Sequence, residues 1–277
     1  MLVGYNTNGF TSHALDDALR VIGGLGYRAV AITIDHAALN PFSRAAPLEL
    51  ARVRGLLEEL DLVPVIETGA RFLLDPWRKH RPTLLEDAAE ERARRSGFLE
   101  RAIDIAAALA APCVSLWSGA RPEGSAASTD ELDERLVGGL GRLCRRAAEV
   151  GVMLAFEPEP GMHVETMADF DRIAAAVSHP AFALTLDVGH AHLTEDSAAE
   201  TVRRYAARLA NVHLEGMRRP VHDHLVPWEG DLDFAAVIAA LREVGYSGPA
   251  TFELSRHSHA AVDTARRALE LIRGLQD

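Results

Sequence analysis

The chain has 277 residues, of which 48% are hydrophobic and 25% are charged, proportions that indicate a globular protein with a sizeable core and exclude a disordered one. Its 40 acidic residues outnumber its 29 basic residues, and the formal charge of -11 makes nucleic acid an unfavourable partner.

Short apolar runs alternate with longer amphipathic segments along the first half of the chain. Thr11 and Ser12 resemble a helix cap, and the first amphipathic segment ends at Gly26, as helices often do. The predicted strands of this half are 2–6, 29–34, 62–67 and 112–117. Their predicted helices are 16–26, 48–61, 86–110 and 129–151.

The second half repeats this alternation. Its predicted strands are 152–157, 181–187, 210–215 and 249–254, and its predicted helices lie near 166–177, 197–209, 233–244 and 259–275. The strands are continuous apolar runs, which is typical of a parallel sheet buried on both faces. Eight strand–helix units without a linker predict a single (β/α)8 TIM barrel over residues 1–277, and no GxGxxG motif indicates a dinucleotide fold.

The number of cysteines and the absence of long apolar stretches indicate the cellular location of the protein. Cys113 and Cys144 are too few for a disulfide framework and are expected to be buried, reduced thiols. No signal peptide and no apolar stretch of about 18 residues is evident, so we expect a cytoplasmic protein that does not contact membranes.

Four successive strands of the second half end in a carboxylate or an imidazole. The functional face of an α/β barrel lies at the C-terminal ends of its strands, so these side chains should meet. A buried carboxylate is costly unless it is paired or bound to a metal. We therefore predict a divalent metal site made of Glu157, Asp187, His213 and Glu253.

The composition of this set bears on the identity of the metal. Three carboxylates and one imidazole suit Mn²⁺ best, while Mg²⁺, Co²⁺ or Zn²⁺ is also compatible. Four protein ligands leave two positions of an octahedral ion open for a substrate, as a catalytic metal requires.

On these residues the sequence resembles the xylose isomerase-like TIM-barrel superfamily, which includes ketose 3-epimerases, inosose isomerases and dehydratases, and zinc-dependent AP endonucleases of the endonuclease IV class. The resemblance covers the whole chain, and its specific part is 152–257. It implies that one metal is held by the four residues above, that Glu157 and Glu253 also move protons, and that His190 contacts the substrate.

A second cluster follows the seventh predicted strand, in the segment VHDHLVPWEGDLDF. It resembles an Asp-x-His pair that binds an additional zinc in the endonucleases, and here the pair is His222 and His224. With His190 they would form a second metal site. Because His replaces Asp, the alternative is that His224 orders the loop while Asp223 or His222 meets substrate hydroxyls. Ser118 ends the fourth strand where the endonucleases need a histidine, which argues against a three-zinc cluster and against DNA repair.

Candidate substrate-binding residues are less sharply defined. Trp77 and Arg71 lie in or near the long loop after the third strand, and an aromatic face beside cations suits a sugar that carries hydroxyl or carboxylate groups. An ordinary solvent-exposed loop is the alternative. The other candidates are His190, Arg256 and His36.

These residues predict a metal-dependent isomerase or epimerase acting on a sugar, cyclitol or related polyol ketone through a metal-stabilised enediolate, with Glu157 and Glu253 as base and acid. The alternatives are a lyase or dehydratase with the same site, a zinc-dependent hydrolase or endonuclease-like enzyme, and a non-catalytic polyol sensor. The expected partner is a small polyol, and a homo-oligomer is compatible with the sequence.

Overall fold

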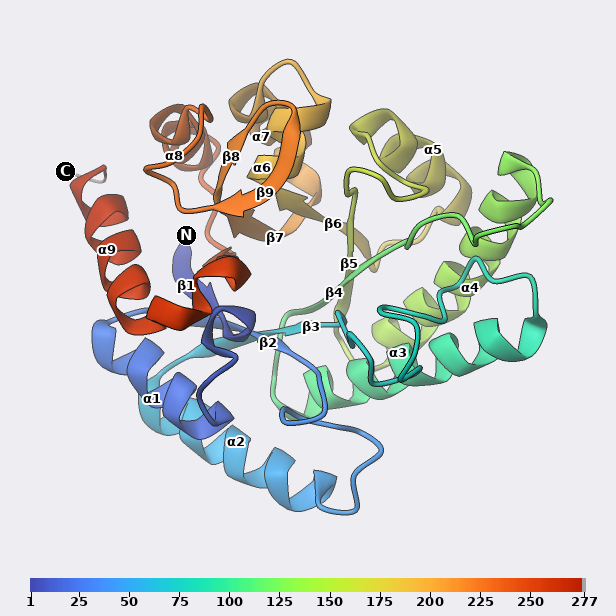
Figure 1. The fold of residues 1–277 in the computed structure, drawn as a ribbon, viewed down its shortest axis with the longest axis horizontal. Helices are drawn as coiled ribbons and strands as arrows, with labels where there is room; N and C mark the ends of the chain where they lie inside the picture. The colour runs from blue at the N-terminus through green and yellow to red at the C-terminus, as the bar shows by residue number, and fades with distance from the viewer. Residues whose placement is uncertain (276–277) are drawn as a thin grey trace.

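The computed structural model describes residues 1–275. Within this range eight parallel strands close into a barrel in the order β1-β10-β7-β6-β5-β4-β3-β2, as Figure 1 shows. This confirms the predicted TIM barrel. The barrel strands are β1 (Leu2–Asn6), β2 (Ala29–Thr33), β3 (Val63–Glu67), β4 (Cys113–Trp117), β5 (Met153–Glu157), β6 (Phe182–Asp187), β7 (Leu209–Leu214) and β10 (Pro249–Phe252).

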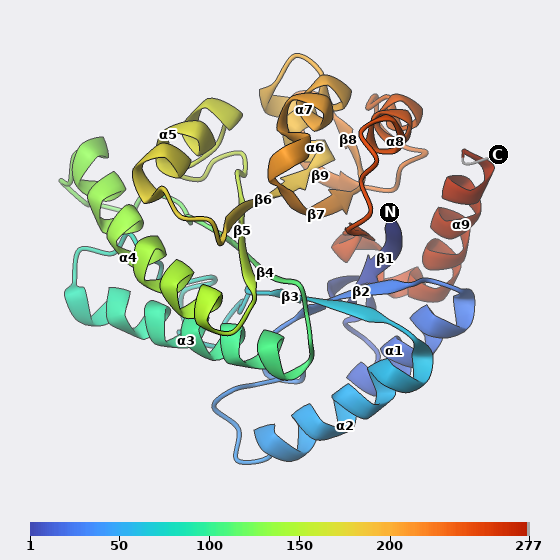
Figure 2. The same cartoon turned by 180° about the vertical axis from the view of Figure 1, so that it is seen from behind.

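Helices follow the strands and surround the barrel (Figures 1 and 2). The α-helices are α1 (Leu15–Leu25), α2 (Ala46–Leu60), α3 (Ala89–Ala108), α4 (Thr129–Glu149), α5 (Met167–Val177), α6 (Val188–Thr194), α7 (Ala198–Tyr205), α8 (Phe234–Glu243) and α9 (Ala261–Gly274). Three short 3-10 helices are η1 (Thr7–Phe10), η2 (Ala206–Arg208) and η3 (Ser255–Ala260). No helix among the described residues is long and apolar enough to cross a membrane.

The alternation of side chains along each strand separates two cores. The larger core fills the space between strands and helices, and Cys144 belongs to it. A small cluster of Ala31, Val65, Cys113 and Ala155 packs separately, with one residue from each of four consecutive strands. Both cysteines are buried and free, as predicted. Because strand side chains have a period of two, the next inward positions on β3, β4 and β5 are Glu67, Ser115 and Glu157.

Three local expectations from the sequence were wrong. Helix α1 is not capped by Thr11 or Ser12, because Thr11 ends η1 and the residue before α1 is Ala14, which makes no side-chain cap. An additional helix, α6, follows β6 directly and is capped by Asp187, whose Oδ1 accepts hydrogen bonds from the amides of Gly189 and His190 at 2.7 and 2.9 Å.

The third difference is a hairpin in the segment that was expected to be a loop. Strands β8 (Gly216–Arg218) and β9 (Val221–Leu225) pair in antiparallel fashion after β7. Figure 1 shows the hairpin beyond the barrel strands, beside α6 and α8. It places His222 and His224 two residues apart on β9, so that both side chains are on the same face.

Candidate metal centre and active site

The four predicted ligands meet at the C-terminal rim of the barrel. One ligand atom from each of Glu157, Asp187, His213 and Glu253 lies within 4.8 Å of all the others. Glu157 and Asp187 are the last residues of β5 and β6, His213 is on β7, and Glu253 follows β10. Adjacent parallel strands thus bring together residues nearly 100 positions apart in sequence.

His213 is at the centre of this group. Its Nδ1 lies 2.8 Å from Glu253 Oε2, 3.2 Å from Glu157 Oε1 and 3.8 Å from Asp187 Oδ2. Three carboxylates around one ring nitrogen require a positive charge there, either a proton or a metal ion. Although burial lowers the pKa of His213, the surrounding carboxylates outweigh it and raise that pKa well above its usual value.

Glu67 holds the opposite side of the same ring. Its Oε1 lies 2.9 Å from His213 Nε2 and also accepts a hydrogen bond of 3.3 Å from Asn211 Nδ2. With the Nε2 proton donated to Glu67, Nδ1 is the nitrogen available to a metal. A carboxylate in this position is the usual partner of a metal-binding histidine, because it fixes the tautomer and the ring orientation.

Asp187 provides a further indication that the group fits a cation. Its Oδ1 caps α6, whereas its buried Oδ2 has no hydrogen-bond partner among the described residues. A buried carboxylate oxygen without a hydrogen-bond donor is unfavourable unless a cation is bound to it. The free oxygen faces the ligand group, since it lies 3.8 Å from His213 Nδ1.

The two glutamates have opposite electrostatic environments. Burial raises the pKa of Glu157 to about 8 despite the nearby His213. Burial also acts on Glu253, but attraction to His213 prevails and lowers the pKa of that carboxyl well below its usual range. Asn8 Nδ2 donates a hydrogen bond of 2.8 Å to Glu253 Oε1 and so fixes its orientation from the β1 side.

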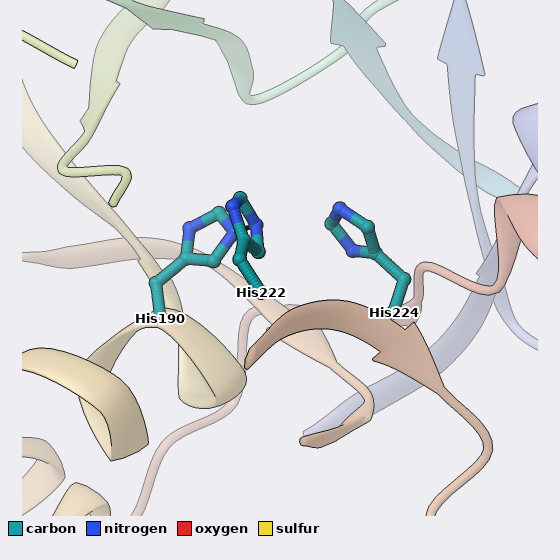
Figure 3. Close-up of side chains that lie close together, drawn as sticks. All are labelled: His190, His222 and His224. Carbon is teal, nitrogen blue, oxygen red and sulfur yellow. Dashed lines mark hydrogen bonds between the residues drawn. The ribbon is translucent and has the colours of Figure 1, made fainter. Parts of the chain in front are cut away.

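A second group of side chains comprises His190 on α6 and His222 and His224 on β9. Figure 3 shows the rings of His190 and His222 close together, with His224 across a gap from them. The Nε2 atoms of His190 and His222 are 3.0 Å apart, and His190 Nδ1 lies 3.2 Å from the carbonyl oxygen of Pro158. Burial lowers the pKa of both imidazoles, that of His190 to about 4, and so favours their neutral forms.

Glu215 contacts a histidine of this group, as Glu67 contacts His213 of the first group. One of its carboxylate oxygens bonds to His224 Nδ1, and the other, Oε1, is buried without a hydrogen-bond partner among the described residues. Burial alone would lower the pKa of His224, but Glu215 outweighs this and raises it. Gly189 makes room for this carboxylate, because a Cβ there would lie 2.3 Å from Glu215 Oε1.

A cavity of about 630 Å³ lies over both groups. Among its lining residues are Glu157, His213 and Glu253 of the first group and His190 and His224 of the second. Its volume lies in the range typical of small-molecule sites. The candidate site is therefore a cavity whose floor carries a cluster of carboxylates and imidazoles.

The predicted substrate-binding residues do not all line the same cavity. His190, Arg256 and Arg71 line the cavity, and Arg256 forms an ion pair with Asp223 of β9. His36 lines a neighbouring cavity together with Arg71. The Trp77 side chain is 89% exposed and lines neither cavity.

Several residues of the site were not singled out as such from the sequence. Asn211 lies two residues before His213 on β7, and the period of a strand would have placed both on the same face. Trp117 lines the cavity and is held by Arg95, whose guanidinium carbon lies 4.9 Å from its ring. Glu159 also lines the cavity, and burial raises its pKa to about 7.

An inosose dehydratase is among the relatives that comparison with known proteins finds. The chain is 31% identical over 137 residues to an inosose dehydratase of Lacticaseibacillus casei, a match that covers 43% of this chain and 46% of the relative. The chain thus matches less than half the length of that protein.

Solved structures share the fold over nearly the whole chain. A D-allulose 3-epimerase from Methylomonas sp. superposes with a TM-score of 0.77 at 21% identity, covering 99% of this chain and 98% of that one. The IolI protein with a bound zinc atom superposes with a TM-score of 0.78 at 17% identity, covering 98% of each chain. The family model that describes the xylose isomerase-like TIM barrel matches residues 19–275. The chain therefore belongs to the xylose isomerase-like TIM barrel family.

Proposed function

We propose that the protein is a metal-dependent isomerase or epimerase acting on a sugar, cyclitol or related polyol ketone. The observation that carries the proposal is the group of Glu157, Asp187, His213 and Glu253, of which Glu157, His213 and Glu253 line a cavity of about 630 Å³. The similarity in fold to a D-allulose 3-epimerase and to a zinc-binding protein supports it.

The residues present fit a divalent cation, because three carboxylates and one imidazole converge and Asp187 Oδ2 has no other partner among the described residues. Glu157, Asp187, His213 and Glu253 would hold the ion, with His213 contributing Nδ1. When bound, the ion supplies a Lewis acid that polarises a carbonyl oxygen and its neighbouring hydroxyl. Mn²⁺ suits this oxygen-rich set, and Zn²⁺ is the alternative.

The chain's own residues then handle the substrate protons. Glu157 and Glu253 come from β5 and from the end of β10, so they approach a bound polyol from different directions. One carboxylate removes the carbon-bound proton and the other returns a proton as general acid. Asn8 orients Glu253, and His190 and Arg256, which line the cavity, orient substrate hydroxyls.

Solvent deuterium provides the test. The metal-loaded enzyme, incubated in heavy water with a panel of ketohexoses, ketopentoses and inososes, should incorporate deuterium at the carbon next to the ketone. Glu157→Gln and Glu253→Gln should each abolish net epimerisation, because the amide cannot take up a proton. Glu165→Gln, an exposed glutamate outside the cavity lining, is the control and should leave turnover unchanged. Undiminished turnover by both active-site variants would reject the two roles.

A lyase is the second candidate, and the inosose dehydratase relative favours it. Elimination of water begins with the same proton removal, so the same carboxylates would serve. The products separate the two outcomes, because an epimerase returns an isomer of equal mass whereas a dehydratase releases a product lighter by one water. Mass spectrometry of the same incubations decides between them.

We also propose that His190, His222 and His224 hold a second ion. His190 Nδ1, donating to the carbonyl of Pro158, leaves Nε2 free, and the 3.0 Å separation from His222 Nε2 approaches the roughly 3.3 Å expected for two nitrogens on one tetrahedral zinc. Glu215 would orient His224 as Glu67 orients His213. Nitrogen ligands make Zn²⁺ the favoured ion at this position.

A further inference from the structure

A second cavity opens beside the candidate active site. It has a volume of about 480 Å³ and lies between the segments that follow β1 and β2, bounded by Arg71 and Phe72 after β3. Asn8, Thr11, Thr33 and Arg71 line both cavities, so the two adjoin at these residues. We call this second cavity the side lobe.

The surface that lines the side lobe is mainly apolar. Its apolar lining consists of Phe10, Leu15, Ala18, Ala37, Ala38 and Phe72. Three of its side-chain oxygens are already hydrogen-bonded: Thr33 Oγ1 donates to Asn6 Oδ1, Thr7 Oγ1 accepts from the Thr33 amide, and Asp35 Oδ1 accepts from the His36 amide. Because most of the lining is apolar, an apolar substituent gains more from burial in the lobe than a hydroxylated one.

Aromatic and cationic side chains give the lobe a preference for flat rings. Phe10 and His13 meet edge to face, with ring centroids 5.1 Å apart, and the Phe72 side chain is 43% exposed. The Arg71 guanidinium lies at the junction with the catalytic cavity, 3.9 Å from Asp35 and only partly neutralised by it. A guanidinium in this position packs favourably on the face of an aromatic ring.

The junction is next to the reacting groups. Asn8 lines both cavities and donates a hydrogen bond to Glu253. A substituent in the lobe would therefore be attached to the edge of the polyol ring that faces Glu253. The catalytic cavity alone has room for a sugar ring, and a free monosaccharide would leave the lobe without a ligand. From the adjacency of the two cavities and the apolar lining of the lobe we propose that the substrate is a keto-glycoside or similarly substituted polyol ketone, whose aromatic or other apolar substituent occupies the side lobe. This inference rests on the proposed function and specifies its substrate class.

The test measures binding and requires no turnover, which separates it from the test of catalysis. Phenyl β-D-glucopyranoside and methyl β-D-glucopyranoside carry the same sugar and differ in one aromatic ring. Their dissociation constants for the Mn²⁺-loaded protein are compared by calorimetry. Burial of the phenyl ring should tighten binding about tenfold or more relative to the methyl glycoside. Equal affinities, including no detectable binding of either, would overturn the proposal, whatever the deuterium experiment shows.

Two variants locate the binding to the lobe. Ala37→Trp places an indole at an exposed position of the lobe lining, and it should remove most of the phenyl preference while leaving the affinity for the methyl glycoside unchanged. Phe72→Ala should reduce the preference in the same direction. Ala175→Trp, at an exposed position of α5, is the matched control and should behave as the unaltered protein. A phenyl preference that survives both lobe variants would place the ring elsewhere and refute the assignment.

Discussion

His213 connects the interior of the barrel to its rim through the two nitrogens of one ring. Nε2 faces Glu67 on β3, and Nδ1 faces the carboxylates from β5, β6 and the end of β10. The sequence indicated the four proposed ligands because each stands at or next to a strand end. It did not indicate the role of Glu67, because only closure of the barrel brings β3 opposite β7.

At the residue scale, the first prediction concerns the ligands themselves. Asp187→Ala and His213→Ala should each weaken Mn²⁺ binding by more than about a hundredfold, since loss of a direct ligand should cost at least as much as loss of an outer partner. The barrel should stay folded, because its apolar cores lie outside the ligand group. Calorimetric titration measures the affinity and circular dichroism the fold. Asp130→Ala, exposed on α4, is the control, and parental affinity in both ligand variants would disprove the coordination sphere.

Glu67 permits a subtler prediction. Glu67→Ala should weaken metal binding about 10- to 100-fold, because His213 would lose the acceptor that fixes its tautomer. Glu67→Gln keeps an acceptor oxygen and should recover most of that loss. The same titration measures both variants, with Glu123→Ala, an exposed position, as control. If Glu67→Ala binds Mn²⁺ as tightly as the parent, the carboxylate does not position His213.

At the scale of elements, the strands and most helices were predictable, whereas the region after β6 was not. Helix α6 contains a glycine and two histidines and begins without a loop, and its cap is the same Asp187 that was interpreted as a ligand. Both interpretations of Asp187 are compatible because its two oxygens divide the tasks: Oδ1 caps the helix and Oδ2 faces the ligand group. The hairpin was missed because the segment VHDHL has little apolar content, so no strand signal stood out.

The hairpin depends on close packing at its base, which gives a prediction for Gly216. A Cβ at this position would lie 2.3 Å from the Val226 carbonyl oxygen and 2.6 Å from that of Glu229, so Gly216→Ala must displace the backbone. We expect a destabilisation of about 1–3 kcal/mol and loss of the zinc proposed at His190, His222 and His224. Elemental analysis and thermal unfolding measure the two effects.

Gly138 provides the matched control for that variant. It lies inside α4, and a Cβ added there would have nothing within 4 Å, so Gly138→Ala should be neutral or stabilise by up to about 1 kcal/mol. Retention of the second ion by Gly216→Ala, together with clear destabilisation, would contradict the predicted dependence of this site on the packing of the hairpin.

At the scale of the whole molecule, charge and fold lead to different expectations about partners. The sequence resembles zinc-dependent endonucleases as well as sugar isomerases, but a formal charge of -11 repels a polyanion. Ser118, the residue after β4, accepts a hydrogen bond of 3.1 Å from the Val164 amide and donates to the Gly119 carbonyl. This serine therefore braces the loop after β5 and supplies no zinc ligand.

We accordingly predict that the protein does not cleave DNA at abasic sites. A duplex with one abasic position, incubated at moderate salt with the Mn²⁺- or Zn²⁺-loaded protein, should stay intact on a denaturing gel. The same preparations should be tested for sugar binding, which demonstrates that the protein is folded. Metal-dependent incision at the abasic position would overturn both this prediction and the substrate class proposed above.

The contacts of Glu67 and Asn8 have a consequence for how the two halves of the chain assemble. All four residues of the first ligand group follow Val152, whereas Glu67 and Asn8, which hold His213 and Glu253 from outside, precede Trp117. A fragment beginning at Val152 would carry every ligand yet lack both braces. High metal affinity would then appear only when the N-terminal half docks, so metal binding would report closure of the barrel and, by reciprocal linkage, favour it.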